Sequence, residues 1–348
     1  MKKKLAILAL GVIALRLWVL AGGADALTAR LTETDEAVFL PNAEATDTVT
    51  QAAPPEPSPT WEPPFFERPY VTPEPPKEET PPAPSEEPEA QPEEPTPEIL
   101  PTTIPGGLTI RNSTAYQPDI AWLLTEGASL TLPKEGVQIL IVHTHGSEAY
   151  TPDGVDQYEP SDTCRTEDKR YSVIRVGDVL AEKLESYGLT VTHDREIYDY
   201  PSYTGSYSRS GEAVSAHLAA HPETAIVIDL HRDALGTGDV VYKTVAAVDG
   251  EKSSQLMLLV GTDDSGLEHP NWEENLKLAL QMQKAVNARY PTLARPVSLV
   301  RERYNQHLTT GSLILEVGSS GNTLQEALSA VRLFADAVGP LLAEMVEK

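Results

Sequence analysis

The stretch QILIVHTHGSEAY, residues 138–150, joins a predicted strand to a candidate site. An unbroken apolar run, residues 139–142, leads directly into His143 and His145, with Glu148 close behind. A run of Val, Ile and Leu without polar alternation is typical of a strand that is covered on both faces of a sheet. In open α/β sheets the ligand site lies beyond the carboxyl ends of the strands. These polar side chains are therefore candidates for such a site.

The same pattern occurs twice more along the chain. AIVIDLHRD, residues 225–233, is a second apolar run and delivers His231. LILEVG, residues 313–318, is a third and delivers Glu316. If the three strands are parallel neighbours, their polar side chains converge on one site.

Strand-like and helix-like segments alternate across residues 106–348, which are enough for one large core. Helical spacing is predicted for residues 171–188, 210–220, 273–288 and 323–347, and further strands for residues 189–193, 239–247 and 255–260. This alternation predicts an α/β fold, a single three-layer domain with a mostly parallel sheet.

The first 23 residues read as a membrane segment. Three lysines precede an apolar run that is broken only by Arg16, which predicts an N-in orientation with the rest of the chain extracytoplasmic. The run approaches the roughly 20 residues that span a bilayer. We therefore expect a single-pass anchor at the cell membrane, with a cleaved signal sequence as the alternative.

Residues 24–105 have the composition of a disordered linker. They hold about two thirds of the chain's 30 prolines, and residues 32–100 carry 17 acidic side chains against Arg68 and Lys77, a net of −15 within the total of −25. Prolines and repelling carboxylates favour an extended chain. The folded part is thus only moderately acidic, and no basic stripe indicates nucleic-acid binding. Cys164 is the single cysteine, so no intramolecular disulfide is expected.

Two histidines and a carboxylate are the ligand types of catalytic zinc, which keeps a fourth position open for water. His145 and His231 are the preferred ligands. Asp168, at the start of the first predicted helix, is ranked as the third ligand ahead of Glu148. His143 is an alternate ligand, a group that orients His145, or a core histidine.

The remaining candidates surround this predicted centre. Glu316, a carboxylate in an apolar strand, is the expected general base, and an ion pair with Arg232 or Arg209 is the alternative. Arg232 is expected to assist the oxyanion. Tyr207 and Arg209, in a tyrosine-rich loop at residues 198–210, are expected to bind substrate. Asn322 is also expected to bind substrate, or else to cap the last predicted helix.

The motifs HTHGSEAY, RTEDKRYSVIRVGDVLAEKL, YDYPSYTGSYSRS, IDLHRDA, RYNQHL and LEVGSSGNTLQEA, in this order, resemble the stage II sporulation protein P family of endospore-forming bacteria. The resemblance covers roughly residue 107 to the end of the chain. It implies a fold similar to the zinc N-acetylmuramoyl-L-alanine amidases. It also implies essential histidines in the first and fourth motifs, a catalytic Glu316, and a helix-start carboxylate that favours Asp168.

The resemblance further implies a membrane-anchored peptidoglycan hydrolase of engulfment. Such an enzyme cleaves the N-acetylmuramoyl-L-alanine amide and has an additional endopeptidase activity on stem peptides. The expected partners are the stage II sporulation proteins D, a glycan-strand hydrolase, and M, a membrane anchor, at the septal or engulfing membrane. Two alternatives remain, an exported cell-wall binding module that recruits other hydrolases and a metal-dependent sugar deacetylase.

Overall fold

The structure of the chain is a computed structural model, and it describes residues 98–101, 108–237, 240–248 and 250–348. Its main sheet is built from the strands β1 (Glu98–Pro101), β2 (Thr109–Asn112), β3 (Ile139–Val142), β4 (Val191–His193), β5 (Ile226–Asp233), β10 (Leu256–Gly261), β11 (Val297–Val300) and β12 (Ser312–Ser319). The spatial order is β1-β2-β11-β10-β12-β5-β3-β4. Two short hairpins stand outside this sheet, β6 (Gly236–Thr237) with β7 (Val240–Val241) and β8 (Ala246–Val248) with β9 (Glu251–Ser253).

Most neighbouring strands of the main sheet run parallel. The parallel pairs are β2 with β11, β11 with β10, β12 with β5, β5 with β3 and β3 with β4. The antiparallel pairs are β1 with β2 and β10 with β12. The prediction of an α/β fold with a mostly parallel sheet is confirmed.

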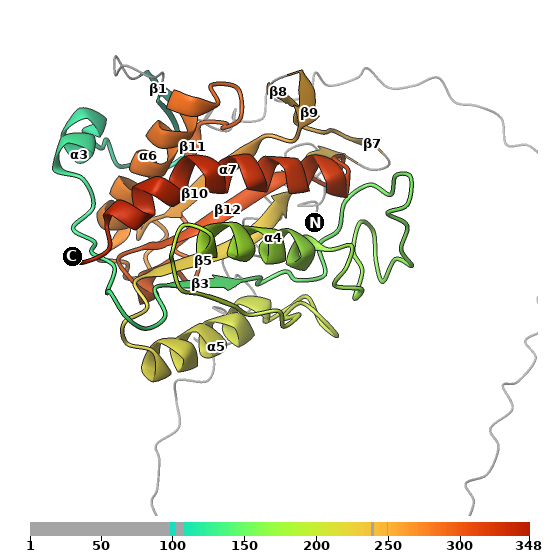
Figure 1. The fold of residues 1–348 in the computed structure, drawn as a ribbon, viewed down its shortest axis with the longest axis horizontal. Coiled ribbons are helices and arrows are strands. Elements are labelled where there is room, and N and C mark those ends of the chain that lie inside the picture. Colours follow the sequence, from blue (N-terminus) through green and yellow to red (C-terminus); the bar gives the residue numbers. More distant parts are fainter. Residues whose placement is uncertain (1–97, 102–107, 238–239, 249) are drawn as a thin grey trace, which may run out of the picture. The chain divides into compact units, whose positions relative to one another are not determined.

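Helices cover both faces of this sheet. They are α3 (Ile120–Glu126), α4 (Val173–Glu185), α5 (Ser206–Ala220), α6 (Trp272–Arg289) and α7 (Leu324–Glu344), together with the short 3-10 helix η1 (Gln306–Leu308). Figure 1 shows α4 and α7 side by side across one face, with α5 beyond β3 on the other side. The fully buried β3 alternates between the two layers, as its period of two requires. Ile139 and Ile141 join the large core that includes α4 and α7, whereas Leu140 and Val142 pack with Val214 of α5.

The sequence predictions locate the principal helices and the buried strands, with differences at their ends. The second predicted helix begins at Ser206 instead of residue 210 because the tyrosine-rich loop contributes its first turn. β2, β11 and α3 were not predicted. β1 lies within the range expected to be linker and pairs with β2. The folded part therefore takes in residues before the expected boundary at 105.

The expected membrane anchor, residues 1–23, and nearly all of the expected linker lie outside the described residues. In the part of the chain that the structure describes, we find no helix with the length and apolar character needed to cross a bilayer.

Candidate functional site

The three apolar runs become the adjacent parallel strands β12, β5 and β3, so their carboxyl ends lie at one edge of the sheet. Glu316 of β12 is in register with His231 of β5. His145 lies three residues beyond the end of β3. The sheet therefore brings the polar ends of all three runs to one place, as parallel neighbours require.

His231 lies between two carboxylates and is only 1% exposed. Its Nε2 is 2.8 Å from Asp229 Oδ1, and its Nδ1 is 3.3 Å from Glu148 Oε2. Burial lowers the pKa of His231, but Asp229 and Glu148 outweigh burial and raise this pKa to about 10. The position is thus suited to a buried positive charge.

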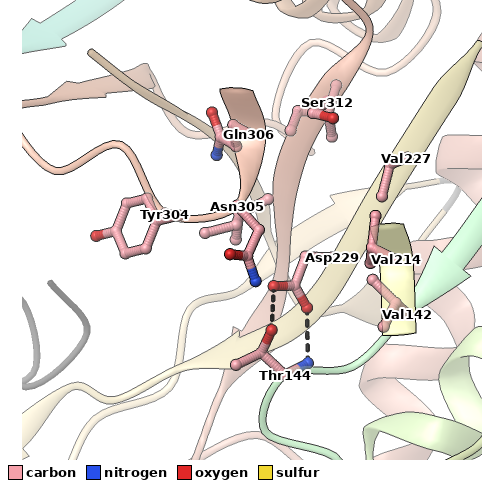
Figure 2. Close-up of a pocket in the computed structure, with 11 residues that line it drawn as sticks. Val142, Thr144, Val214, Val227, Asp229, Tyr304, Asn305, Gln306 and Ser312 are labelled. Atoms are coloured by element: carbon pink, nitrogen blue, oxygen red, sulfur yellow. Dashed lines mark hydrogen bonds between the residues drawn. The ribbon is translucent and has the colours of Figure 1, made fainter. Parts of the chain in front are cut away.

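Thr144 fixes the Asp229 carboxylate with two hydrogen bonds, shown in Figure 2. The Thr144 backbone N–H donates to Oδ1 over 2.8 Å, and its hydroxyl donates to Oδ2 over 2.7 Å. Burial raises the pKa of Asp229, but His231 and Thr144 lower it further than burial raises it. Asp229 is therefore a fixed acceptor for His231 Nε2, which leaves Nδ1 directed at Glu148.

Glu148 is fully buried and surrounded by cationic groups. Its Oε2 accepts the backbone N–H of Arg232 over 3.1 Å. Its Oε1 lies 3.7 Å from Arg165 Nη2 and 3.8 Å from Arg232 Nη1. These neighbours offset the cost of burying a carboxylate beside His231.

His145 is fully buried on the other side of His231. The two rings are nearly perpendicular, with centres 5.3 Å apart, and Tyr203 stacks on His145 at 4.4 Å. His145 Nδ1 lies 3.9 Å from Asp199 Oδ2. Aromatic packing and a nearby carboxylate therefore hold the ring with its opposite edge toward the site.

Asp199 was not singled out from the sequence. It accepts hydrogen bonds from the Ser147 backbone over 3.0 Å and the Ser147 hydroxyl over 2.6 Å, and it forms an ion pair with Arg165. The only sequence signal is its place in the tyrosine-rich loop. The structure places its carboxylate beside Nδ1 of His145.

His143 is directed away from this site, so its role as an alternate ligand is not supported. Its Nδ1 bonds to the Leu230 carbonyl at 2.9 Å, and its Nε2 lies 2.8 Å from Nε2 of His193. Because β3 ends at Val142, the alternation of strand side chains does not place His143 and His145 on the same face. Burial and then His193 lower the pKa of His143 to about 3, so it is a neutral core histidine.

Asp168 lies elsewhere on the surface. Its carboxylate is bound by Arg170, with 2.5 Å between Oδ2 and Nη2, and this bond is the main cause of its lowered pKa. The hollow that Asp168 lines shares no described residue with the pocket at His231. The geometry thus reverses the ranking made from the sequence, because Glu148 contacts His231 and Asp168 does not.

Arg232, like Arg209 and Asn322 below, holds a backbone segment in place. Arg232 donates from Nε to the Ala149 carbonyl over 2.9 Å and from Nη2 to the Cys164 carbonyl over 2.8 Å, which fixes the chain after Glu148. Its guanidinium is thus engaged by two carbonyls and lies 3.8 Å from Glu148, and its expected assistance to an oxyanion stays a prediction.

Arg209 donates from Nε to the Tyr198 carbonyl over 2.8 Å, and so closes the tyrosine-rich loop. Asn322 accepts from the Ser319 N–H over 3.0 Å and donates to the Thr244 carbonyl over 2.9 Å. The cap of α7 is Thr323, which forms a capping box with Glu326. The positions of Arg209 and Asn322 are therefore those of loop braces.

Tyr207, by contrast, lines a pocket together with His231 and Glu316. The other described residues of this wall are Arg111, Ser113, Asp233, Met257, Leu259, Arg295, Ser298, Val300, Tyr304 and Ile314. Glu316 is 6% exposed at this wall. A buried carboxylate beside a histidine and an open pocket is a suitable proton acceptor for a bound reactant.

Among residues 98–101, 108–237, 240–248 and 250–348, no three or more His, Cys, Asp or Glu side chains are grouped closely enough to be recognised as a metal site. The candidate ligand atoms instead occur as close pairs around His231. Of the ligands predicted from the sequence, His231 and Glu148 form one such pair, with 3.3 Å between Nδ1 and Oε2.

The fold and the site together define an α/β domain that carries buried histidines and carboxylates at the carboxyl ends of its strands. Residues 67–339 match the family of the stage II sporulation protein P, and the chain belongs to this family. It is 30% identical over 209 residues to stage II sporulation protein P of Bacillus subtilis (strain 168). That match covers 57% of this chain and 49% of the relative, so the chain matches about half of the relative's length.

Two solved structures have a partly similar fold. N-acetylmuramoyl-L-alanine amidase AmiC2 of Nostoc punctiforme is 14% identical with a TM-score of 0.32, and covers 60% of this chain and 96% of its own. The CwlD amidase of Clostridioides difficile, solved with the GerS lipoprotein, is 14% identical with a TM-score of 0.34, and covers 60% of this chain and 98% of its own.

Proposed function

We propose that this chain is a zinc-dependent peptidoglycan hydrolase of sporulation. Its main reaction is cleavage of the N-acetylmuramoyl-L-alanine amide, with stem-peptide cross-links as a second substrate. The proposal joins the family membership to one observation, the placement of His231 between Glu148, Asp229 and His145 with Glu316 in register beside it.

The distances around His231 fit a tetrahedral metal. Two ligand atoms about 2.0–2.1 Å from zinc lie about 3.3 Å apart, and His231 Nδ1 lies 3.3 Å from Glu148 Oε2. Two imidazole ligands in the same geometry have ring centres about 5.2 Å apart, and those of His145 and His231 are 5.3 Å apart. We therefore assign His145, Glu148 and His231 as the ligands, with Glu148 in place of Asp168.

The surrounding contacts also have the character of a metal site. A ligating histidine commonly donates its second ring N–H to a carboxylate, and Asp229 supplies that acceptor for His231. The raised pKa of His231 reflects the neighbouring carboxylates Asp229 and Glu148, which favour a cation at this position. Bound zinc would lower the pKa of a water and polarise the scissile carbonyl.

Glu316 carries out the proton transfers in this proposal. It takes a proton from the attacking water and returns it to the amine that leaves as the amide breaks. Its position in register with His231 places the base one strand away from a proposed ligand. Tyr207 limits the pocket on the side of His145, with the two rings 5.5 Å apart, and so restricts where the substrate can lie.

The test is digestion of purified peptidoglycan by the full chain, with and without a chelator, with the fragments identified by mass. Release of stem peptides from muramic acid that stops with chelator and returns with zinc is the expected result. Acetate release would indicate a deacetylase. Binding to peptidoglycan without any product, from a folded and zinc-loaded chain, would indicate the binding module.

We also propose that residues 1–23 anchor the chain in the membrane and that the linker, from residue 24 up to β1, lets the domain reach the cell wall. The stage II sporulation proteins D and M are the proposed partners. The support is the lysine-flanked apolar run and the Pro-rich acidic composition. Loss of membrane association when residues 1–23 are removed would support the anchor, and unchanged association would contradict it.

A further inference from the structure

The pocket beside Glu316 continues across the sheet as far as β2. Its described lining includes His231 on β5, Glu316 on β12, Met257 on β10, Ser298 on β11 and Arg111 on β2. These are five consecutive strands in the order of the sheet. One pocket thus connects the proposed reaction site to a distant arginine.

The strand registers form a row beneath this pocket. Glu316 pairs with His231 and with Met257, and two residues further along β10 Leu259 pairs with Ser298, which pairs with Arg111. Residues in register on neighbouring strands, and residues two apart on one strand, point to the same face. The row is therefore a continuous floor on one face of the sheet.

The length of this floor defines what it can hold. Four strand spacings of about 4.8 Å separate β5 from β2, which gives about 19 Å. An extended peptide advances about 3.3 Å per residue, so about five or six residues span the same distance. A peptide stem attached to the sugar at the scissile amide has this length.

The chemistry changes along the floor. Its middle is apolar, with Met257, Leu259 and Val300 packed together. Two arginines also line the pocket. Arg295 is neutralised by Asp233, whose Oδ2 lies 2.7 Å from its Nη1. Arg111 has no ion pair or hydrogen bond from its side chain within the described part of the chain, so its charge is available to a ligand.

We propose that the floor is the binding groove of the stem peptide and that Arg111 binds a stem carboxylate four or five residues from the muramoyl amide. This assignment rests on the proposed amidase function. An arginine can bind a carboxylate through two parallel hydrogen bonds, which gives both affinity and a measure of stem length. Arg111 is then a specificity-determining residue at the far end of the site.

The test compares two muramoyl pentapeptides that differ only in the terminal group, a carboxylate or a carboxamide. The full chain is expected to cleave the carboxylate form with a kcat/KM about tenfold higher or more, mainly through a lower KM. In Arg111→Met that ratio falls to about one, and Arg111→Lys retains part of it. Arg332→Met, at an exposed position on α7, is the matched control and keeps the full ratio.

A preference that persists unchanged in a folded Arg111→Met protein would overturn the proposal. So would equal cleavage of both peptides by the unaltered chain.

Failure of the amidase proposal is distinguishable from failure of this one. If no muramoyl peptide is cleaved, calorimetric titration of the same two peptides still decides the role of the groove. Tighter binding of the carboxylate form that is lost in Arg111→Met would support the groove. Absence of peptide binding, or binding that is indifferent to the terminal group and to Arg111, would refute it.

Discussion

Asp229 Oδ1 lies 2.8 Å from Nε2 of His231, two residues further along β5, and Thr144 fixes the same carboxylate from the segment after β3. The orientation of one imidazole therefore depends on two neighbouring strands. A ring held in this way presents its other nitrogen in one direction only, which is what a metal ligand requires.

The first prediction concerns this contact. Asp229→Asn replaces the acceptor for His231 Nε2 with an amide and is expected to weaken zinc binding by roughly 10–100-fold. Competition with a chromophoric chelator measures the change. Asp162→Asn, at an exposed position, is the control. Equal zinc affinity in both variants would show that Asp229 does not position the histidine.

The second prediction separates the two candidate carboxylate ligands. Glu148→Gln is expected to abolish stoichiometric zinc retention because it removes the oxygen nearest to His231 Nδ1. Asp168→Asn is expected to retain zinc because Asp168 is bound to Arg170. Metal analysis after gel filtration gives the answer, and the reverse pattern would restore Asp168 as the ligand.

The third prediction concerns the proposed base. Glu316→Gln preserves the shape of the pocket wall but cannot accept the proton from water. The peptidoglycan cleavage rate is expected to fall by about 10²–10⁴-fold, with zinc content unchanged. Retained hydrolysis by the folded variant would exclude Glu316 as general base, and loss of zinc would instead make it a ligand.

The fourth prediction concerns stability at Gly177. A Cβ on this helical glycine would lie 2.6 Å from Nε2 of both His143 and His193. Alanine normally favours a helix over glycine, but the clash reverses the sign here, and Gly177→Ala is expected to reduce the free energy of unfolding by about 1–3 kcal/mol. Urea unfolding measures it, and Glu182→Ala, exposed on the same helix, is the control.

The fifth prediction concerns acid stability. The pKa of His143 is about 3 in the folded chain, against 6.5 for an unperturbed histidine, so the unfolded chain binds the proton more readily between these values. The free energy of unfolding is therefore expected to decrease as the pH falls from about 6.5 to about 3. Burial also lowers the pKa of His269, to about 4, and adds to this slope. A metal-free His143→Asn protein is expected to show a shallower decrease, and an unchanged slope would contradict this account.

Much of the fold was predictable because the spacing of hydrophobic residues along a helix or strand can be read from the local sequence. β3 is apolar at every position, and β5 and β12 each contain three consecutive apolar residues before their first charged residue. This pattern indicates burial on both faces whatever the neighbours are. β11 and β2 escaped prediction because each has only four residues and, unlike the four of β3, these include polar ones, so no continuous apolar run marks the strand.

The site was predictable only in part. His145 and His231 follow their strands, but the choice between Glu148 and Asp168 depends on how the loop after His145 returns to β5. The direction of the His143 side chain was not predictable for a similar reason. His143 lies one residue past the end of β3, where side chains no longer alternate between the two faces of the sheet. Asp199 and Thr144 act through contacts across more than 50 residues of sequence, and no local pattern indicates such contacts.

The order of the sheet makes the proposed chemistry dependent on complete folding. The strand that carries Glu316 pairs with β5, more than 80 residues earlier, and with β10 on its other side. Pairings of such long range form late, since the intervening chain must first be closed into a loop. A chain still being synthesised, or one truncated before β12, would hold the histidines but not the proton acceptor. Under the proposed function, hydrolysis therefore requires the complete sheet, since the proton acceptor is added only when β12 has paired with β5 and β10.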